Sequence, residues 1–319
     1  MKILAIQNRM GIGDMVIFLP YIEAVAKKYN SQVTLLVKEN SKAEHLIKDN
    51  KYINEIIILK RDQTKKSFHD GLNGFFRLVS DIKKCQFDKV LIFNSSLRYK
   101  LVCKFAGIND IYQYPLFKKK NQHIIEAANK LLKNNFNLEI KSDPVIDVKD
   151  ENVQKIKLKF NFSDEVKNIL LGIGGSGPTK RIPPKVFIEF MNLCLKNFKC
   201  RFFLATGNKN EEIEIMNEIL SYHKNLCTPL NELSISETLP IIKNCNIAIC
   251  NDSSFSHLSA GLGKQTIVLM SDTPLIYGSY SSKMHPIMPD GVEKVTHGTE
   301  GKERINPLKI FEKFQSLVN

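Results

Sequence analysis

The sequence predicts an α/β fold in two halves, because short apolar runs alternate with amphipathic helical patterns twice along its 319 residues. In the first half the strand-like runs are Lys2–Ile6, Val33–Val37, Ile56–Leu59 and Val90–Phe93, and the helical patterns include Leu72–Lys84 and Leu97–Ala106. In the second half the strands are Ile169–Ile173, Phe202–Thr206, Ile247–Cys250 and Thr266–Met270, alternating with helices near Val186–Asn197, Glu211–Tyr222 and Glu237–Asn244. Such alternation predicts parallel sheets joined by right-handed crossovers.

Length and composition support two domains. A hydrophobic content of 43% is enough for two cores, and 319 residues suit two domains of about 150 residues each. The polar and charged stretch Asn137–Asn152, which surrounds Pro144, has the composition of a linker. We therefore expect one domain at residues 1–150 and a second at residues 151–319.

Other patterns exclude several classes of protein. No apolar run approaches the roughly 20 residues that cross a bilayer, and the short apolar N-terminus predicts a strand rather than a secretion signal. The seven cysteines form no Cys-x-x-Cys pair and lie mostly in apolar segments, which favours buried thiols in a reducing cytoplasm. No cluster of His, Cys and carboxylate residues has metal-ligand spacing, so we expect no catalytic metal.

The most informative segment is Gly172–Pro184, GIGGSGPTKRIPP, which follows an apolar run and precedes a helix opened by two prolines. The small residues Gly174, Gly175 and Ser176 let backbone amides approach an anion closely. Thr179 and Lys180 add a hydroxyl and a cation, a combination that suits a diphosphate. The spacing fits neither a Walker A loop nor the dinucleotide-binding fingerprint. An ordinary turn between strand and helix is the alternative.

A second candidate element follows the first strand. Gly11, Ile12 and Gly13 form a tight turn, and Asp14 opens an apolar-periodic helix. A carboxylate at the carboxyl edge of a parallel sheet points into the crevice where α/β proteins bind ligands. The alternative interpretation is that Asp14 is only a helix cap.

A third element comes after the strand Ile247–Cys250, where Asp252, Ser253 and Ser254 precede a helix that ends near Gly263. These side chains are predicted to lie at a helix N-terminus beside the sheet edge. His257 follows about one turn later, and a satisfied core histidine is its alternative interpretation.

Together these elements resemble glycosyltransferase family 9, which contains the ADP-heptose:lipopolysaccharide heptosyltransferases. The matching segments occur in the family's order over nearly the whole chain: GIGDMVIFLP at Gly11–Pro20, SSLRYKLVCKFAGI at Ser95–Ile108, GGSGPTKRIPP at Gly174–Pro184, TGNKNEE at Thr206–Glu212 and NDSSFSHLSAGLGK at Asn251–Lys264. The resemblance implies a GT-B fold, with two Rossmann-like domains facing across a cleft and the C-terminal helix Pro307–Leu317 packing back on the first domain. Two departures fall on the donor side. The family's Asp-Thr-Gly is Asp252-Ser253-Ser254 here, and Ile182 replaces a common tryptophan.

The resemblance also implies roles for individual residues. Asp14 matches the general base of an inverting sugar transfer. Lys180, with Thr179 and the amides near Ser253 and Ser254, would neutralise the leaving diphosphate of an ADP-sugar, most simply ADP-heptose, without a cofactor. Glu211 matches the position that binds the nucleotide ribose, and Glu212 is its close competitor.

The acceptor side is expected in the first half, where Gly13 and Asp14 meet the acceptor and Arg98 is a candidate cation. The formal net charge of +13 includes Lys118, Lys119 and Lys120 in a predicted loop. In the resembling family this half meets an acidic glycolipid at the cytoplasmic leaflet, where a few lysines hold a protein weakly. A solvated lysine face is the plain alternative. Nucleic-acid binding is disfavoured because no recognition motif is present.

We therefore expect a monomeric cytoplasmic glycosyltransferase, with weak peripheral contact at the inner face of the cytoplasmic membrane, that moves a sugar to a lipopolysaccharide core or related glycolipid. Two other classes remain open. One is another nucleotide-sugar enzyme of this shape, such as an epimerase. The other is a catalytically silent nucleotide-sugar or lipid-binding protein, against which the retention of Asp14 and Lys180 argues.

Overall fold

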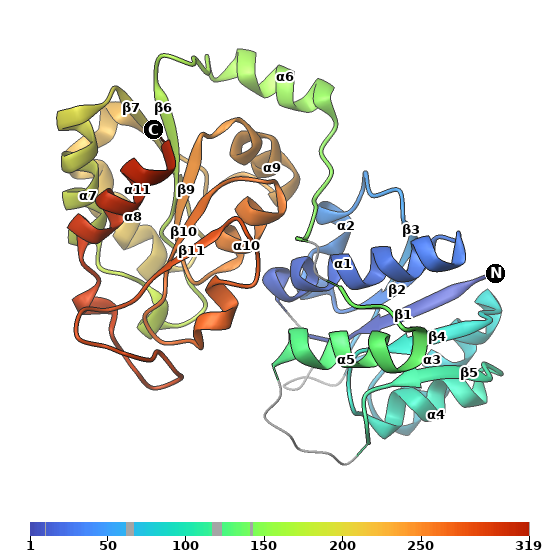
Figure 1. Ribbon diagram of the computed structural model, residues 1–319. Coiled ribbons are helices and arrows are strands. Elements are labelled where there is room, and N and C mark those ends of the chain that lie inside the picture. The colour runs from blue at the N-terminus through green and yellow to red at the C-terminus, as the bar shows by residue number, and fades with distance from the viewer. Residues whose placement is uncertain (10, 62–66, 117–122, 141–142, 319) are drawn as a thin grey trace. The chain divides into compact units, whose positions relative to one another are not determined.

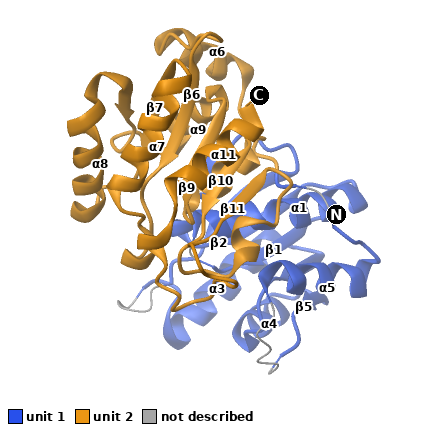
Figure 2. Ribbon diagram, turned by 60° about the vertical axis from the view of Figure 1, so that its left-hand side comes forward, with its two compact units in different colours: residues 1–144 blue, residues 145–319 orange. Residues whose placement is uncertain are grey.

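The computed structural model describes the chain except residues 10, 62–66, 117–122, 141–142 and 319 (Figure 1). It divides into two compact units, residues 1–144 and 145–319 (Figure 2). Each unit holds one parallel sheet covered by helices on both faces, so the predicted α/β fold is confirmed. None of the helices in the described part of the chain combines the length and the apolarity that spanning a bilayer requires.

The sheet of the first unit has the strand order β3-β2-β1-β4-β5. Its described strands are β1 (Ile3–Gln7), β2 (Val33–Val37), β3 (Ile53–Ile58), β4 (Lys89–Ile92) and β5 (Asp110–Gln113). Its helices are α1 (Ile12–Tyr29), the short α2 (Ala43–Leu46), α3 (Gly71–Cys85), α4 (Leu97–Phe105) and α5 (Ile124–Phe136). Helix α1 contacts α5 on one face, and α3 contacts α4 on the other, over a core that includes Leu4, Leu78 and Tyr99.

The sheet of the second unit has the order β11-β10-β9-β6-β7-β8. Its strands are β6 (Lys167–Gly172), β7 (Cys200–Ala205), β8 (Cys227–Pro229), β9 (Ile247–Asn251), β10 (Thr266–Leu269) and β11 (Met284–Ile287). Its helices are α6 (Asp150–Lys159), α7 (Pro184–Asn197), α8 (Asn210–His223), α9 (Ile235–Asn244), α10 (Ser254–Gly261) and α11 (Pro307–Val318).

Both strand orders place a change of winding direction beside the central strands. In the first unit the chain winds outward from β1 in one direction and from β4 in the other, and β6 and β9 have the same relation in the second. Ligands of open α/β sheets bind where the carboxyl ends of such strand pairs diverge. The segments that follow β1, β4, β6 and β9 are therefore the places to examine.

The structure corrects details of the sequence prediction. Helix α1 begins at Ile12, so Asp14 lies in its first turn rather than opening it. The strands β5, β8 and β11 and the helices α2, α5 and α6 were not predicted. The apolar face of α11, with Ile310, Phe311 and Phe314, is buried in the core of the second unit against α7. All seven cysteines are free thiols.

Candidate functional site

Two loops of the second unit meet at the carboxyl ends of β6 and β9. The Asn251 side-chain amide, at the end of β9, donates hydrogen bonds to the carbonyl oxygens of Ile173 at 2.7 Å and Gly174 at 3.2 Å. Asn251 is fully buried, so these bonds fix the start of the glycine-rich loop against the neighbouring strand. The segments predicted separately from Gly172–Pro184 and Asn251–Lys264 thus form one site.

The centre of this site is an ion pair. The Lys180 Nζ lies 2.7 Å from Oδ2 of Asp252, and the Asp252 side chain is only 5% exposed while that of Lys180 is 24% exposed. Burial alone would raise the pKa of the Asp252 carboxyl, but the adjacent Lys180 ammonium lowers it, and the pKa lies below its ordinary value. Asp252 therefore holds a partly accessible cation in a fixed place beside the glycine-rich loop.

Helix α10 begins next to this pair. Its N-cap residue, Ser253, makes no side-chain capping bond, and among the described atoms its buried hydroxyl has no partner. The first-turn amides of a helix carry partial positive charge and favour an anion. His257, one turn later, is buried, and its Nδ1 lies 2.9 Å from the Tyr280 hydroxyl, against whose ring it stacks. The site thus offers hydroxyl, amide and ammonium donors together.

The glycine-rich loop also receives a carboxylate from α8. The backbone amide of Gly175 donates to Oε1 of Glu212 at 3.0 Å. A Cβ atom added at Gly174 would lie 2.6 Å from Glu212 Oε1, and one added at Gly207 would lie 2.6 Å from Oε2. Both positions therefore need glycine for the carboxylate to approach. Glu212 is buried and Glu211 is exposed, so the structure brings the competitor, rather than Glu211, to the loop.

The remaining loop residues have different surroundings. Gly174 and Gly175 are buried, whereas Ser176 is exposed. The carbonyl oxygen of Thr179 accepts a hydrogen bond from the Ser271 hydroxyl at 2.8 Å, which ties the loop to the residues after β10. Bonds at Ile173, Gly174, Gly175 and Thr179 thus anchor the loop that leads to Lys180.

In the first unit, Asp14 occupies the third position of α1. Its Oδ2 accepts a hydrogen bond from the Gly11 amide at 3.2 Å, and its Oδ1 lies 3.3 Å from Nη1 of Arg9. The side chain is 22% exposed, so one carboxylate oxygen is held by the helix start while the residue stays within reach of solvent. Gly13, beside it, is buried. Sequence reasoning missed Arg9, although it lies only five residues before Asp14.

A cavity of about 440 Å³ opens at the carboxyl ends of β1, β4 and β5, and its lining includes Arg9, which pairs with Asp14. Aromatic and amide side chains line it, together with the cations Arg9 and Lys130, and its described lining contains no carboxylate. The lining residues are Asn8, Arg9, Phe18, Phe93, Asn94, Ser95, Gln113, Tyr114, Pro115, Ile124, Ala127, Lys130, Leu131, Asn134 and Asn135. Aromatic faces, amides and cations without an acid suit an anionic carbohydrate.

Three lining side chains each have a buried polar atom that lacks a hydrogen-bond partner among the described atoms. Asn94 Oδ1 accepts from the Ser96 amide at 2.9 Å, and Gln113 Nε2 donates to the Ser96 carbonyl at 2.9 Å. Among the described atoms, Asn94 Nδ2, Gln113 Oε1 and the Tyr114 hydroxyl are buried without a partner. Asn94 could have been found because it follows a predicted strand. Gln113 ends β5 and Tyr114 follows it, and this strand has no apolar run.

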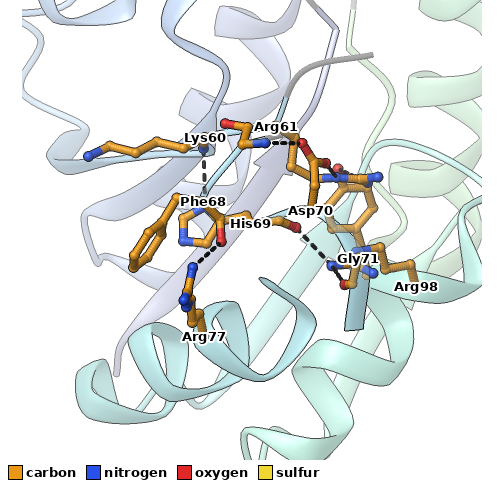
Figure 3. Close-up of polar contacts among 10 residues, drawn as sticks. Lys60, Arg61, Phe68, His69, Asp70, Gly71, Arg77 and Arg98 are labelled. Atoms are coloured by element: carbon orange, nitrogen blue, oxygen red, sulfur yellow. Dashed lines mark hydrogen bonds and ion pairs between the residues drawn. The ribbon is translucent and has the colours of Figure 1, made fainter. Parts of the chain in front are cut away.

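Arg98 is engaged elsewhere. Its Nη2 donates to the carbonyl oxygens of His69 at 2.9 Å and Gly71 at 3.1 Å, which holds the segment between β3 and α3 (Figure 3). Asp70 in the same segment pairs with Arg61 Nε at 3.0 Å. The predicted basic cluster, Lys118, Lys119 and Lys120, lies outside the described residues. Within the described residues, no group of three or more His, Cys, Asp and Glu side chains is placed to hold a metal ion.

Comparison with known proteins points to one family. The family model described as glycosyltransferase family 9 (heptosyltransferase) matches residues 75–289. Lipopolysaccharide heptosyltransferase 1 of Campylobacter coli is 22% identical, over 93% of this chain and 91% of the relative.

Solved structures share the fold over the full chain. The structure of E. coli ADP-heptose lps heptosyltransferase II has a TM-score of 0.76 at 18% identity and covers 100% of this chain and 98% of its own. E. coli heptosyltransferase WaaC with ADP has a TM-score of 0.72 at 13% identity and covers 99% of each chain. A UDP-GlcNAc 2-epimerase from Methanocaldococcus jannaschii is less similar, with a TM-score of 0.57 at 14% identity and coverage of 100% and 93%.

Proposed function

Because the chain belongs to glycosyltransferase family 9 and is therefore a glycosyltransferase, we propose that it transfers heptose from ADP-heptose to a lipopolysaccharide core or related glycolipid. The family description and the E. coli and Campylobacter coli relatives support the choice of sugar and acceptor. The GT-B fold of the solved relatives supports a nucleotide donor in the second unit and an acceptor in the first. The epimerase alternative is weaker because its fold match is poorer.

The observation that carries the proposal is the Lys180–Asp252 pair beside the start of α10. As the bond to the anomeric carbon breaks, the departing ADP gains negative charge on its diphosphate. Lys180, the first-turn amides of α10 and the Ser253 hydroxyl would stabilise that charge, and donors of this kind are each worth about 3 kcal/mol in a transition state. Asp252 serves by holding Lys180 in position. These donors supply the neutralisation, so we propose that no divalent metal is required.

The acceptor hydroxyl must lose a proton while it attacks. Asp14 is the proposed base, and a single displacement at the anomeric carbon inverts the configuration. The Gly11 amide and Arg9 hold the Asp14 carboxylate in one orientation. Gly13 belongs to the same turn.

The cavity at the carboxyl ends of β1, β4 and β5 is the proposed acceptor site. Arg9 and Lys130 supply positive charge for an acidic sugar, and Asn94, Gln113 and Tyr114 supply hydrogen bonds for its hydroxyl groups. Arg98 acts as a positioning residue through the segment that it holds. Lys118, Lys119 and Lys120 remain proposed contributors to acceptor or lipid binding.

The nucleotide lies, in this proposal, against the glycine-rich loop. Glu212 takes the ribose-binding role in preference to Glu211, because it contacts the loop and is fixed by Gly174, Gly175 and Gly207. Thr179 and His257 complete the donor side. We further propose that the protein works as a monomer at the inner face of the cytoplasmic membrane, where a glycolipid acceptor is presented.

The deciding experiment incubates the protein with ADP-heptose, UDP-GlcNAc and GDP-mannose, with and without a glycolipid acceptor, and measures free nucleotide and product. We expect acceptor-dependent release of ADP from ADP-heptose and none from the other donors. Conversion of UDP-GlcNAc to an epimer would support the epimerase instead. Tight binding of a nucleotide with no turnover of any donor would support a silent binding protein.

A further inference from the structure

Six large apolar side chains gather on one exposed face of the first unit. They come from α3, α4 and the segment that precedes α3, and each is more than a third exposed. These residues are Phe68 (50%), Leu72 (73%), Phe76 (56%), Leu97 (43%), Leu101 (37%) and Phe105 (61%). We call this the α3/α4 face. Clustered exposure of this kind is uncommon on a monomeric protein and marks an interaction surface.

Helical spacing makes these residues continuous. Leu72 and Phe76 are four residues apart, as are Leu97, Leu101 and Phe105, so each set lines one side of its helix. The opposite sides, which include Leu78 and Tyr99, are buried in the core.

Phe75 bridges the two helices. Its ring centroid lies 5.3 Å from that of Phe76 and 5.9 Å from that of Phe105. The apolar surface therefore runs unbroken from α3 to α4, which also contact each other directly.

Cations flank this surface. The two helices carry six basic residues, Arg77, Lys83, Lys84, Arg98, Lys100 and Lys104, and one acidic residue, Asp81. All of the basic residues except Arg98 are exposed. The Arg77 guanidinium lies 4.6 Å from the centroid of the Phe68 ring, so a cation and an exposed ring are held side by side (Figure 3).

This combination selects among partners. Apolar side chains that enter the headgroup region, with lysine and arginine at their margin, are the pattern of proteins that lie on anionic lipid. A second copy of the same face would bring six cations against six cations, which disfavours self-association. Nucleic acid would use the charge but leave the apolar residues exposed.

We propose that the α3/α4 face docks the protein on an anionic lipid surface. The idea rests on the proposed function in one respect, because a glycolipid acceptor gives the docking its purpose. Leu72 and Leu97 lie at the N-terminal ends of their helices, which follow β3 and β4, at the same edge of the sheet as Asp14. Docking by this face brings that edge toward the lipid headgroups.

Sedimentation with vesicles of phosphatidylcholine containing phosphatidylglycerol tests the apolar part. The variant Leu72→Gln/Phe76→Gln/Leu101→Gln removes three exposed apolar side chains while keeping good helix formers. We expect its vesicle affinity to fall about tenfold or more. The matched control Leu158→Gln/Leu308→Gln changes equally exposed leucines on helices of the second unit and should bind within about twofold of the wild type. The single variant Leu101→Gln repeats the test with the smallest disturbance of the fold.

The charged part is tested with Lys100→Glu/Lys104→Glu against the control Lys155→Glu/Lys224→Glu, which makes the same change in charge on the second unit. The first variant should bind anionic vesicles weakly and lose most of its salt sensitivity, whereas the control should behave like the wild type. Equal losses in variant and control would overturn the proposal, because they would indicate a general charge effect.

Two further outcomes separate this proposal from the proposed function. Transfer to a delipidated, water-soluble acceptor should be unchanged in every variant of the α3/α4 face. If the variants lost vesicle binding selectively but the wild type transferred no sugar, the docking proposal would be supported and the proposed function would be wrong. The docking proposal would be wrong if the wild-type protein did not bind vesicles, or if it formed dimers that the apolar variant dissociates. Neither result would affect the proposed transferase activity.

Discussion

The Lys180 ammonium lies 2.7 Å from the Asp252 carboxylate, so the proposed ligand of the donor diphosphate is also the counterion of a buried acid. A buried pair of this kind is costly to break from one side, because the remaining charge has lost its compensation. A single substitution of Lys180 therefore changes both the stability of the protein and its proposed contact with the diphosphate. Comparing single and double substitutions separates them.

We expect Lys180→Met to lower the free energy of unfolding by about 3 kcal/mol at neutral pH, because Asp252 is left charged and unpaired. The double variant Lys180→Met/Asp252→Asn should regain most of that stability. Both should lose about 10²-fold or more in turnover, since each lacks the Lys180 ammonium that donates hydrogen bonds to the diphosphate. Urea unfolding and steady-state kinetics measure the two effects. A double variant with restored turnover would show that Lys180 acts only as the counterion.

The same pair gives a pH dependence with a defined sign. The pKa of Asp252 is lowered in the folded protein, so its stabilising contribution is present above the unfolded pKa of about 3.9 and is lost as the pH falls through the folded value. In Lys180→Met the ammonium no longer offsets the effect of burial, so the pKa of Asp252 should be higher than in the wild type. The stability difference between wild type and Lys180→Met should therefore be largest near neutral pH and shrink below about pH 4. A difference that is independent of pH would contradict the pairing.

Asp14→Asn tests the proposed base. Asparagine can still accept the hydrogen bond from Gly11, so stability should fall by under about 1 kcal/mol, whereas turnover should fall by about 10² to 10⁴. Glu126→Gln is a matched control, because Glu126 also lies in the first turn of a helix of the first unit, α5. Near-normal turnover of Asp14→Asn, or its unfolding, would return Asp14 to a capping role.

The features predicted from the sequence were those carried by local patterns. The buried central strands have continuous apolar runs. The glycine-rich loop and Asp252 follow such runs closely, and Asp14 comes eight residues after one. The strands β5, β8 and β11 are three or four residues long and partly exposed at or near sheet edges, so no apolar run marks them. Helix α6 has no buried residue and begins at the end of the polar linker, so no apolar pattern marked it.

Side-chain direction was harder to predict than position along the chain. Successive residues of a helix point about 100° apart, so the choice between Glu211 and Glu212 needed the true start of α8 and its orientation on the sheet. The proposed acceptor cavity draws residues from three strand ends and from α5, and only the assembled sheet brings them together. Arg98 shows the converse, because a cation in a matching motif proved to hold two backbone carbonyls.

The choice between the two glutamates is testable by calorimetry with ADP. We expect Glu212→Gln to weaken ADP binding by about tenfold or more, because its buried carboxylate loses charge at the loop. Glu211→Gln should change it by less than about twofold, since Glu211 is exposed. Gly207→Ala should mimic Glu212→Gln, because the new Cβ would lie 2.6 Å from Oε2 of Glu212. If Glu211→Gln weakened ADP binding more than Glu212→Gln, Glu211 would be the residue that binds the ribose.

Tyr114→Phe tests the acceptor cavity, because it should leave protein stability unharmed while it weakens acceptor binding. In the free protein the Tyr114 hydroxyl is buried without a partner among the described atoms, and burial raises its pKa. Removing an unpartnered buried hydroxyl relieves a desolvation cost of about 1 to 3 kcal/mol, so the variant should be at least as stable as the wild type. If an acceptor hydroxyl group completes this site, the same change should raise the acceptor KM by about tenfold while the donor KM stays constant. Tyr112→Phe, two residues earlier in β5 and outside the cavity lining, is the control and should leave both constants unaltered. A destabilised Tyr114→Phe with unchanged acceptor KM would mean that the hydroxyl serves the fold, and the acceptor would then have to bind elsewhere in the first unit.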